Sequence, residues 1–115
     1  MTSQHERTAL HVELMKQAAL QALSYVQGMT QQSFDLDHKT QDAVVMKLLV
    51  IGELATKVMA EDPPFVERHT FIPWVQMKGM RNRMAHGYFE LDQAVVWDTV
   101  TNALPDLITQ LDQIK

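Results

Sequence analysis

Residues 43–51 read Ala-Val-Val-Met-Lys-Leu-Leu-Val-Ile, and this stretch decides the fold. A single lysine interrupts the run, so a helix formed here is apolar on nearly every side. Such a helix is either the central helix of a bundle or part of a subunit interface. Because few helices of a 115-residue chain can be fully surrounded, we expect partial burial against a second copy of the chain. Gly52, one turn after Leu48, would allow another helix to approach closely.

The helix that contains this run has clear boundary signals, and so has the helix before it. Asp37 is a candidate N-cap, and Pro63-Pro64 must end the helix. Upstream, Ser3 and Glu6 have the spacing of a capping box that opens a first helix, and Gly28 is the expected stop. Two adjacent apolar stripes predict that the first helix has a wide buried face, and they consist of Leu10, Leu14, Ala18, Ala22 and Tyr25, and of Val12, Met15, Ala19, Leu23 and Val26.

A third helix is predicted from Pro73, since the first turn of a helix tolerates proline. Met77, Met80 and Met84 share one face of this helix, a spacing typical of a core or an interface. Gly87 is expected to interrupt it.

A last helix is predicted to start at Asp92, and its inner stripe comprises Val96, Val100, Ala103, Leu107, Leu111 and Ile114. The apolar phase is kept across Pro105, so we expect a kinked helix or two abutting ones. No stretch alternates with period two over the length of a strand. The sequence therefore predicts an all-α fold, an antiparallel bundle of four to five helices in a two-fold homodimer, with residues 1–115 as one domain.

The composition excludes several classes of protein. The chain has no cysteine, which rules out disulfide scaffolds, thiolate zinc sites, Fe–S clusters and a cysteine nucleophile. No stretch reaches the roughly 18 uncharged apolar residues of a membrane span, and the first residues lack the apolar segment of a signal peptide. We therefore expect a cytoplasmic protein with no membrane partner.

The histidines outside residues 76–88 do not form a metal-binding pattern. His5, His11, His38 and His69 are scattered over helix starts and loops, with neither HExxH nor the paired ExxH of di-iron bundles. We interpret each as a surface histidine, and we expect no metal and no cofactor. Glycine-rich phosphate loops and a GxSxG elbow are also absent from the sequence.

The charge distribution singles out one short window. The formal net charge is −4, yet residues 76–88 hold Lys78, Arg81 and Arg83 with no acidic residue. The negative total argues against general coating of nucleic acid. The window is either a chance cluster on a solvated face or a confined anion site. In the second interpretation, Lys78 and Arg83 line a cleft and bind phosphate.

Residues 79–88 of this window read Gly-Met-Arg-Asn-Arg-Met-Ala-His-Gly-Tyr, which places Arg81, His86 and Tyr88 at short fixed offsets. These residue types suit RNA cleavage without a metal. A histidine can take the proton from a ribose 2′-hydroxyl or give one to the leaving 5′-oxygen. A guanidinium can bind the non-bridging phosphate oxygens and stabilise the charge that builds on them.

Helical geometry restricts how the motif can work. Asn82 and His86 lie one turn apart on the same face, so the Asn82 amide can hold the imidazole. Arg81 lies about 140° away from His86 if the helix is unbroken. Either the helix breaks before His86, or two copies of the motif meet in a symmetric dimer, and we favour the dimer. In such a dimer, one histidine could act as base and the other as acid.

A purely structural interpretation of the motif also stays open. In it, Arg81 pairs with an acidic residue of a neighbouring helix and His86 caps the third helix.

The motif resembles the Arg-x4-His-x-Tyr signature of HepT-type toxins, a branch of the HEPN (higher eukaryotes and prokaryotes nucleotide-binding) superfamily. The likeness covers essentially the whole chain. Further segments resemble landmarks of that family, in its order, and they are Asp42-Ala43-Val44, Ile51-Gly52-Glu53-Leu54-Ala55, Ile72-Pro73-Trp74, the block from Lys78 to Phe89, Val96-Trp97 and Leu104-Pro105-Asp106-Leu107.

This resemblance implies one HEPN-type helical domain that dimerises about a two-fold axis, with the Arg-x4-His segments lining a cleft at the interface. It implies a type II toxin that acts as a metal-independent endoribonuclease. A nucleotidyltransferase antitoxin would neutralise it by transferring AMP from ATP. On the same basis Arg81 and His86 are catalytic, Asn82 supports them, and Tyr88 accepts AMP. The implied partners are a second copy of the chain, the cognate antitoxin and substrate RNA.

Two other functions stay open at this point. One is a non-catalytic substrate-binding or adaptor subunit of a nucleotidyltransferase, although an adaptor has little need of Arg81, His86 and Tyr88 together. The other is a plain structural bundle.

Four further residues of the chain could belong to the site. Trp74, Trp97 and Phe89 could be base-stacking platforms, although we interpret the two tryptophans as packing residues. Glu53 lies in an otherwise apolar helix, and we expect it to pair with Arg81 or Arg83.

Overall fold

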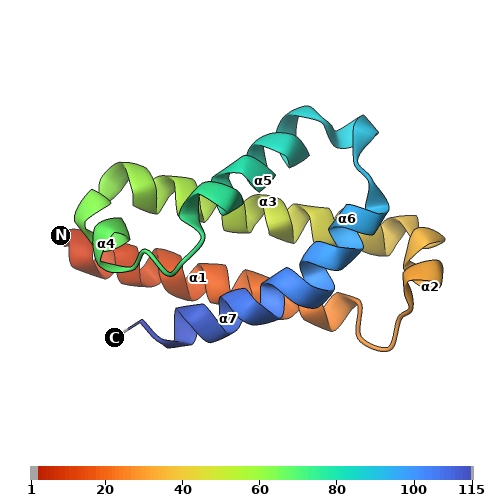
Figure 1. The fold of residues 1–115 in the computed structure, drawn as a ribbon, viewed down its shortest axis with the longest axis horizontal. Helices are drawn as coiled ribbons and strands as arrows, with labels where there is room; N and C mark the ends of the chain where they lie inside the picture. The colour runs from red at the N-terminus through yellow and green to blue at the C-terminus, as the bar shows by residue number, and fades with distance from the viewer. Residues whose placement is uncertain (1–2, 115) are drawn as a thin grey trace.

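The computed structural model describes residues 3–114, and over that range the chain is almost entirely helical, with no strand (Figure 1). The α-helices are α1 (Gln4–Tyr25), α2 (Gln31–Asp35), α3 (His38–Glu61), α4 (Pro63–Arg68), α5 (Trp74–His86), α6 (Gln93–Asp98) and α7 (Leu104–Asp112). A 3₁₀ turn, Tyr88–Glu90, follows α5, and a π-helical stretch, Thr99–Ala103, joins α6 to α7. The all-α prediction is confirmed.

The long helices α1 and α3 lie side by side and antiparallel (Figure 1). α5 packs on α3, while α7 packs on α1. The chain leaves the end of α5, descends through the 3₁₀ turn and runs back along the other side of the pair as α6 and α7 (Figure 1). The 3₁₀ turn therefore joins two helices, α5 and α6, that both contact α3.

The predicted boundaries agree closely with the structure. The Ser3 hydroxyl accepts from the Glu6 backbone N–H at 3.1 Å, and an Asp37 carboxylate oxygen accepts from the Thr40 N–H at 3.0 Å. Asp92 caps α6 in the same way, accepting from the Ala94 N–H at 2.9 Å. Each cap satisfies a backbone donor that has no partner within its own helix.

The predicted number of helices was too low within the described range, because the short helices α2 and α4 were missed. Pro63-Pro64 ends α3 as expected, but the same prolines also occupy the first turn of α4. Asp62 caps this helix, since its side chain accepts from the Phe65 N–H. The expected kink at Pro105 takes the form of two abutting helices, α6 and α7, with the π-helical stretch between them.

The core lies between α1, α3 and the helices that cover them. Its fully buried members include Met15 and Ala19 of α1, Val44, Leu48 and Ile51 of α3, and Val96 and Val100 near the C-terminus. The three methionines of α5, Met77, Met80 and Met84, are also buried, as their spacing predicted. Trp74 is buried as well, and its indole N–H donates to the His69 carbonyl at 3.0 Å. The Trp97 ring packs on Phe34 with centroids 5.3 Å apart, so both tryptophans are packing residues.

The prediction of a wide buried face on α1 was wrong at three positions. Leu10 is 56% exposed, and Leu14 and Tyr25 are also exposed. The reason is that α1 contacts α3 and α7, which cover one side of it and leave these positions outside.

Residues 43–51 are partly buried within the chain, and their burial against a second copy stays a prediction. Met46 is 56% exposed on α3, whereas Val44, Val45, Leu48 and Ile51 are buried. None of the helices in residues 3–114 combines the length and the hydrophobicity that a membrane span requires.

Candidate functional site

Arg81 lies where α5 passes very close to α3. A β-carbon added at Gly52 of α3 would be 2.8 Å from the carbonyl oxygen of Met77 and would collide with the side chain of Arg81. The close approach that Gly52 was expected to allow is therefore confirmed. Because backbone stands in the way, the position accepts only glycine without a shift of α5.

We expect Gly52→Ala to lower the free energy of unfolding by about 1–3 kcal/mol, because the added methyl group pushes α5 away from α3. Urea denaturation followed by circular dichroism measures this loss. Gly79→Ala is the matched control, since a β-carbon there would meet only Nη1 of Arg83, at 3.9 Å. That control should be neutral or more stable by about 0.5–1 kcal/mol, because alanine favours a helix interior. Equal stability of the two variants would contradict the proposed close contact.

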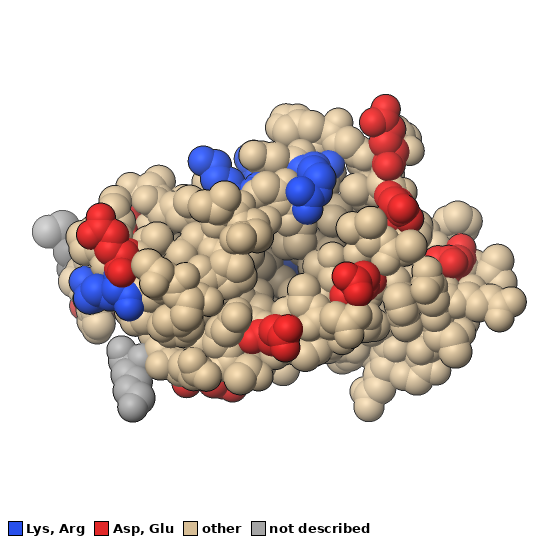
Figure 2. All heavy atoms as spheres, in the orientation of Figure 1, with Lys and Arg blue, Asp and Glu red and all other residues tan. Residues whose placement is uncertain are grey.

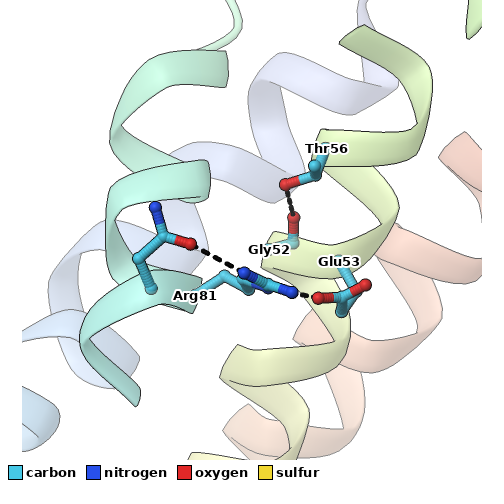
Figure 3. A network of polar contacts seen from close by, with 5 residues as sticks. Gly52, Glu53, Thr56 and Arg81 are labelled. Atoms are coloured by element: carbon cyan, nitrogen blue, oxygen red, sulfur yellow. Dashed lines mark hydrogen bonds and ion pairs between the residues drawn. The ribbon is translucent and has the colours of Figure 1, made fainter. Parts of the chain in front are cut away.

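The guanidinium of Arg81 is held from two sides (Figure 3). Its Nε donates to Oε1 of Glu53 on α3, and its Nη1 donates to Oδ1 of Asn82 at 2.8 Å. The predicted pairing of Glu53 with an arginine of the window is confirmed for Arg81. Both side chains of the pair remain partly exposed, so the pair positions the guanidinium while leaving it accessible to solvent.

The expectation that Asn82 holds His86 was wrong. Within residues 3–114 no hydrogen bond joins the two side chains, and the carbonyl oxygen of Asn82 accepts from Arg81 instead. The physical reason is that a guanidinium is a charged donor and forms the stronger hydrogen bond. Asn82 therefore positions Arg81 rather than the imidazole.

Arg81 and His86 point to different sides of one continuous helix. α5 runs unbroken from Trp74 to His86 and is capped by Gly87, so the alternative of a break before His86 is wrong. The His86 side chain is exposed, and within the described residues it forms no hydrogen bond or ion pair. A single copy of the motif therefore leaves the two groups about 140° apart around the helix axis.

Tyr88 contacts α3 from the 3₁₀ turn. Its hydroxyl donates to Oδ1 of Asp42, and this hydrogen bond raises the pKa of Tyr88, because the carboxylate stabilises the protonated phenol. The side chain remains 45% exposed. Phe89 beside it is 99% exposed, and the two rings meet edge to face with centroids 5.6 Å apart.

The cationic window is divided between two sides of α5. Arg81 faces α3, whereas Arg83 lines cavities on the side of α6 and α7. Lys78 is exposed. Figure 2 shows Lys and Arg side chains over α5, and acidic side chains over the connection that follows it and over α6 and α7. Within residues 3–114 there is no group of three histidine or acidic side chains that could hold a metal ion.

Comparison with known proteins identifies the family. The model of a family described as "Ribonuclease HepT-like" matches residues 15–114. The chain belongs to this HepT-like family. All the site residues that the sequence predicted lie inside the matched range, and the resemblance to HepT-type proteins is confirmed.

Several HepT-like relatives have ribonuclease names. "Putative RNase MJ0127" of Methanocaldococcus jannaschii is 36% identical over 92 residues, which cover 80% of this chain and 74% of the relative. "Probable ribonuclease HepT" of Thermococcus cleftensis is 38% identical over 84 residues, covering 73% and 74%. "Putative RNase TTE0752" of Caldanaerobacter subterraneus is 32% identical over 89 residues, covering 77% of each chain. No solved structure matched the chain significantly.

One contact of this HepT-like site was missed from the sequence, the hydrogen bond from Tyr88 to Asp42. The two residues are 46 positions apart and belong to different helical elements. No local spacing signals such a contact. An exposed carboxylate at the start of a long helix is ordinarily a solvated side chain, and only the packing of α5 on α3 brings the tyrosine to it.

Proposed function

We propose that this chain is the toxin of a type II toxin–antitoxin pair and acts in the cytoplasm as a metal-independent endoribonuclease. The observation that carries the proposal is an Arg81 fixed by Glu53 and Asn82, five residues before an exposed His86, in a HepT-like chain. The ribonuclease names of its relatives support the same activity. We also propose that residues 1–115 form one HEPN-type domain.

In the proposed reaction, His86 removes the proton from a ribose 2′-hydroxyl. The 2′-oxygen attacks the adjacent phosphorus, the bond from phosphorus to the 5′-oxygen breaks, and the departing 5′-oxygen takes a proton from solvent water. Arg81 donates hydrogen bonds to the non-bridging oxygens, where negative charge accumulates in the transition state. The products are a 2′,3′-cyclic phosphate and a 5′-hydroxyl, and no step requires a metal ion.

The site is proposed to need two copies of the chain, because one α5 cannot direct Arg81 and His86 to the same phosphate. We propose a two-fold dimer in which Arg81 of one protomer acts with His86 of the other. The outward stripe of α3 supports this arrangement, since it runs from Asp42 through Met46 and Val50 to Glu53 at helical spacing. Its apolar middle is flanked by two polar contacts, one from Glu53 to Arg81 of α5 and one from Asp42 to Tyr88 of the 3₁₀ turn. A dimer formed on this stripe would bring both copies of the motif together.

Cleavage of RNA in the presence of excess EDTA tests the proposal. The purified chain, freed of any antitoxin, should cut single-stranded RNA and leave cyclic phosphate ends that mass spectrometry detects. Cleavage that disappears on chelation and returns with a divalent cation would contradict metal independence. A chain that never cuts RNA but binds a nucleotidyltransferase would fit the adaptor function instead.

Tyr88 is proposed as the residue that the antitoxin modifies. Its hydroxyl lies at the surface and is reachable by a second enzyme. Transfer of AMP from ATP would release pyrophosphate and replace the hydroxyl proton by the adenylate, and it would therefore break the hydrogen bond to Asp42. It would also place a phosphodiester anion beside that carboxylate and beside the cationic window.

We expect Tyr88→Phe to abolish AMP addition when the chain is produced together with its nucleotidyltransferase and ATP. The chain has one other tyrosine, Tyr25, which is also exposed, so Tyr25→Phe is the matched control. Intact mass spectrometry should show the adenylate on the wild type and on Tyr25→Phe, and none on Tyr88→Phe. An adenylate that persists on Tyr88→Phe would exclude Tyr88 as the acceptor.

A further inference from the structure

A cavity of about 320 Å³ opens between the C-terminal half of α5, the 3₁₀ turn and α6. It lies between α5 and α6, where Figure 2 shows the surface hollowed between basic and acidic side chains. The apolar side chains that line it are Met80, Met84, Leu91, Val95 and Val96. Arg83, Glu90 and Asp92 also line it, so an apolar interior is combined with groups of both charges.

This cavity adjoins the proposed catalytic histidine. Arg83 precedes His86 by three residues on an unbroken helix, so the two side chains lie on the same side of α5. Gly87, which directly follows His86, is itself part of the lining. A molecule bound in the cavity would therefore lie close to both Arg83 and His86.

We propose that this cavity binds one base of the RNA beside the bond that is cut, and that Glu90 selects guanine over uracil there. The inference rests on the proposed ribonuclease function and adds its substrate specificity. Unpaired bases are the part of single-stranded RNA that proteins read, by stacking and by contacts to base edges. The cavity volume lies in the range of small-molecule sites, and methionine side chains suit a planar aromatic ring.

Arg83 supplies the contact to the phosphate of the bound nucleotide. Within the described residues its guanidinium forms no hydrogen bond or ion pair. A free guanidinium at the mouth of the cavity can bind a phosphate through two parallel hydrogen bonds. This cation also offsets the repulsion that RNA would meet from the acidic side chains nearby.

Glu90 supplies the selectivity, because an ionised carboxylate only accepts hydrogen bonds. Guanine presents two adjacent N–H donors on its Watson–Crick edge, which match the two carboxylate oxygens. Uracil presents carbonyl oxygens on both sides of its single N–H, and they would face the carboxylate unfavourably. Asp92 is less available, since one of its oxygens already accepts from the Ala94 N–H. Glu90 has no hydrogen-bond or ion-pair partner through its side chain in residues 3–114.

Sequencing of the cleavage products of a random RNA library tests this assignment. The wild type should cut bonds flanked by guanine at one position about tenfold more often than bonds flanked by uracil. Glu90→Gln carries both a donor and an acceptor, so the ratio should fall to within about twofold while overall cleavage persists. Glu67→Gln, an exposed residue of α4 remote from the cavity, should keep the wild-type ratio. An unchanged ratio in Glu90→Gln, with cleavage intact, would overturn the inference and leave the proposed function standing.

A binding measurement tests the guanine selectivity of the cavity even if the chain does not cut RNA. In protein labelled with ¹³C at the methionine methyl groups, guanosine 3′-monophosphate should shift the signals of Met80 and Met84 in NMR spectra. Uridine 3′-monophosphate should require about tenfold more nucleotide for the same shift, and Glu90→Gln should reduce this difference. Met46, exposed on α3, should not respond to either nucleotide. Guanosine 3′-monophosphate that leaves Met80 and Met84 unshifted would overturn the inference independently of any ribonuclease assay.

Discussion

His86→Ala is expected to slow RNA cleavage by about 10²–10⁴-fold, the range that a general acid or base contributes. The melting temperature should stay unchanged, because His86 is exposed and forms no side-chain hydrogen bond or ion pair within the described residues. Initial rates on a fluorescent RNA, together with a thermal melt of each variant, measure the two effects. His38→Ala is the matched control, since His38 is an exposed histidine at the first residue of α3.

A His86→Ala variant that still cuts RNA at the wild-type rate would remove the proton-transfer role of this residue. Cleavage would then have to come from another group of the chain or from a contaminating nuclease. The second case would favour the adaptor function. A large fall in melting temperature together with the loss of activity would show that His86 acts through stability, contrary to its exposed position.

Arg81→Ala is expected to lower the rate constant of cleavage by about 10²–10³-fold, because it removes a donor directed at the charge that develops on the phosphate. The free energy of unfolding should fall by no more than about 1 kcal/mol, since the Arg81–Glu53 pair is partly exposed and partly screened by solvent. Single-turnover kinetics separate this effect from weaker RNA binding. Arg68→Ala, which removes an exposed arginine of α4, should leave the cleavage rate intact.

A Glu53→Gln variant complements the Arg81→Ala experiment. Glu53→Gln keeps an acceptor for Arg81 but removes the negative charge, so it should alter the cleavage rate far less than Arg81→Ala does. If Arg81→Ala proves as active as the wild type, Arg81 serves only to join α5 to α3. The ion pair would then be structural, as the purely structural interpretation holds.

Much of the fold could be predicted from the sequence because the residues that begin and end a helix act on backbone groups close to them in the chain. Asp37, Asp92 and Gly87 act through backbone groups within one turn of themselves, and each occupies its expected capping position. The burial of individual side chains could be predicted less reliably than the helix ends. Leu10 and Leu14 have the spacing of core residues, but their burial depends on how many helices cover α1, and spacing along one helix does not contain that information.

Some contacts of the candidate site could likewise be predicted from the sequence, and others could not. Glu53 was expected to find an arginine because a carboxylate in an apolar helix needs a partner. The partners of Asn82 and Tyr88 depend on the angle and distance at which α5 crosses α3. Gly52 determines that distance by admitting the α5 backbone, and the bond from Tyr88 to Asp42 is a consequence of the packing that no pattern of spacing indicates.

In the proposed dimer, one protomer supplies Arg81 and the other supplies His86. Heterodimers of Arg81→Ala and His86→Ala chains, purified through a different tag on each chain, test it most directly by RNA cleavage. Each variant alone should cut RNA at least about 10²-fold more slowly than the wild type, whereas the heterodimer should regain a measurable share of the wild-type rate, because it contains one intact pair across the interface. A heterodimer as inactive as both parents would contradict the shared site.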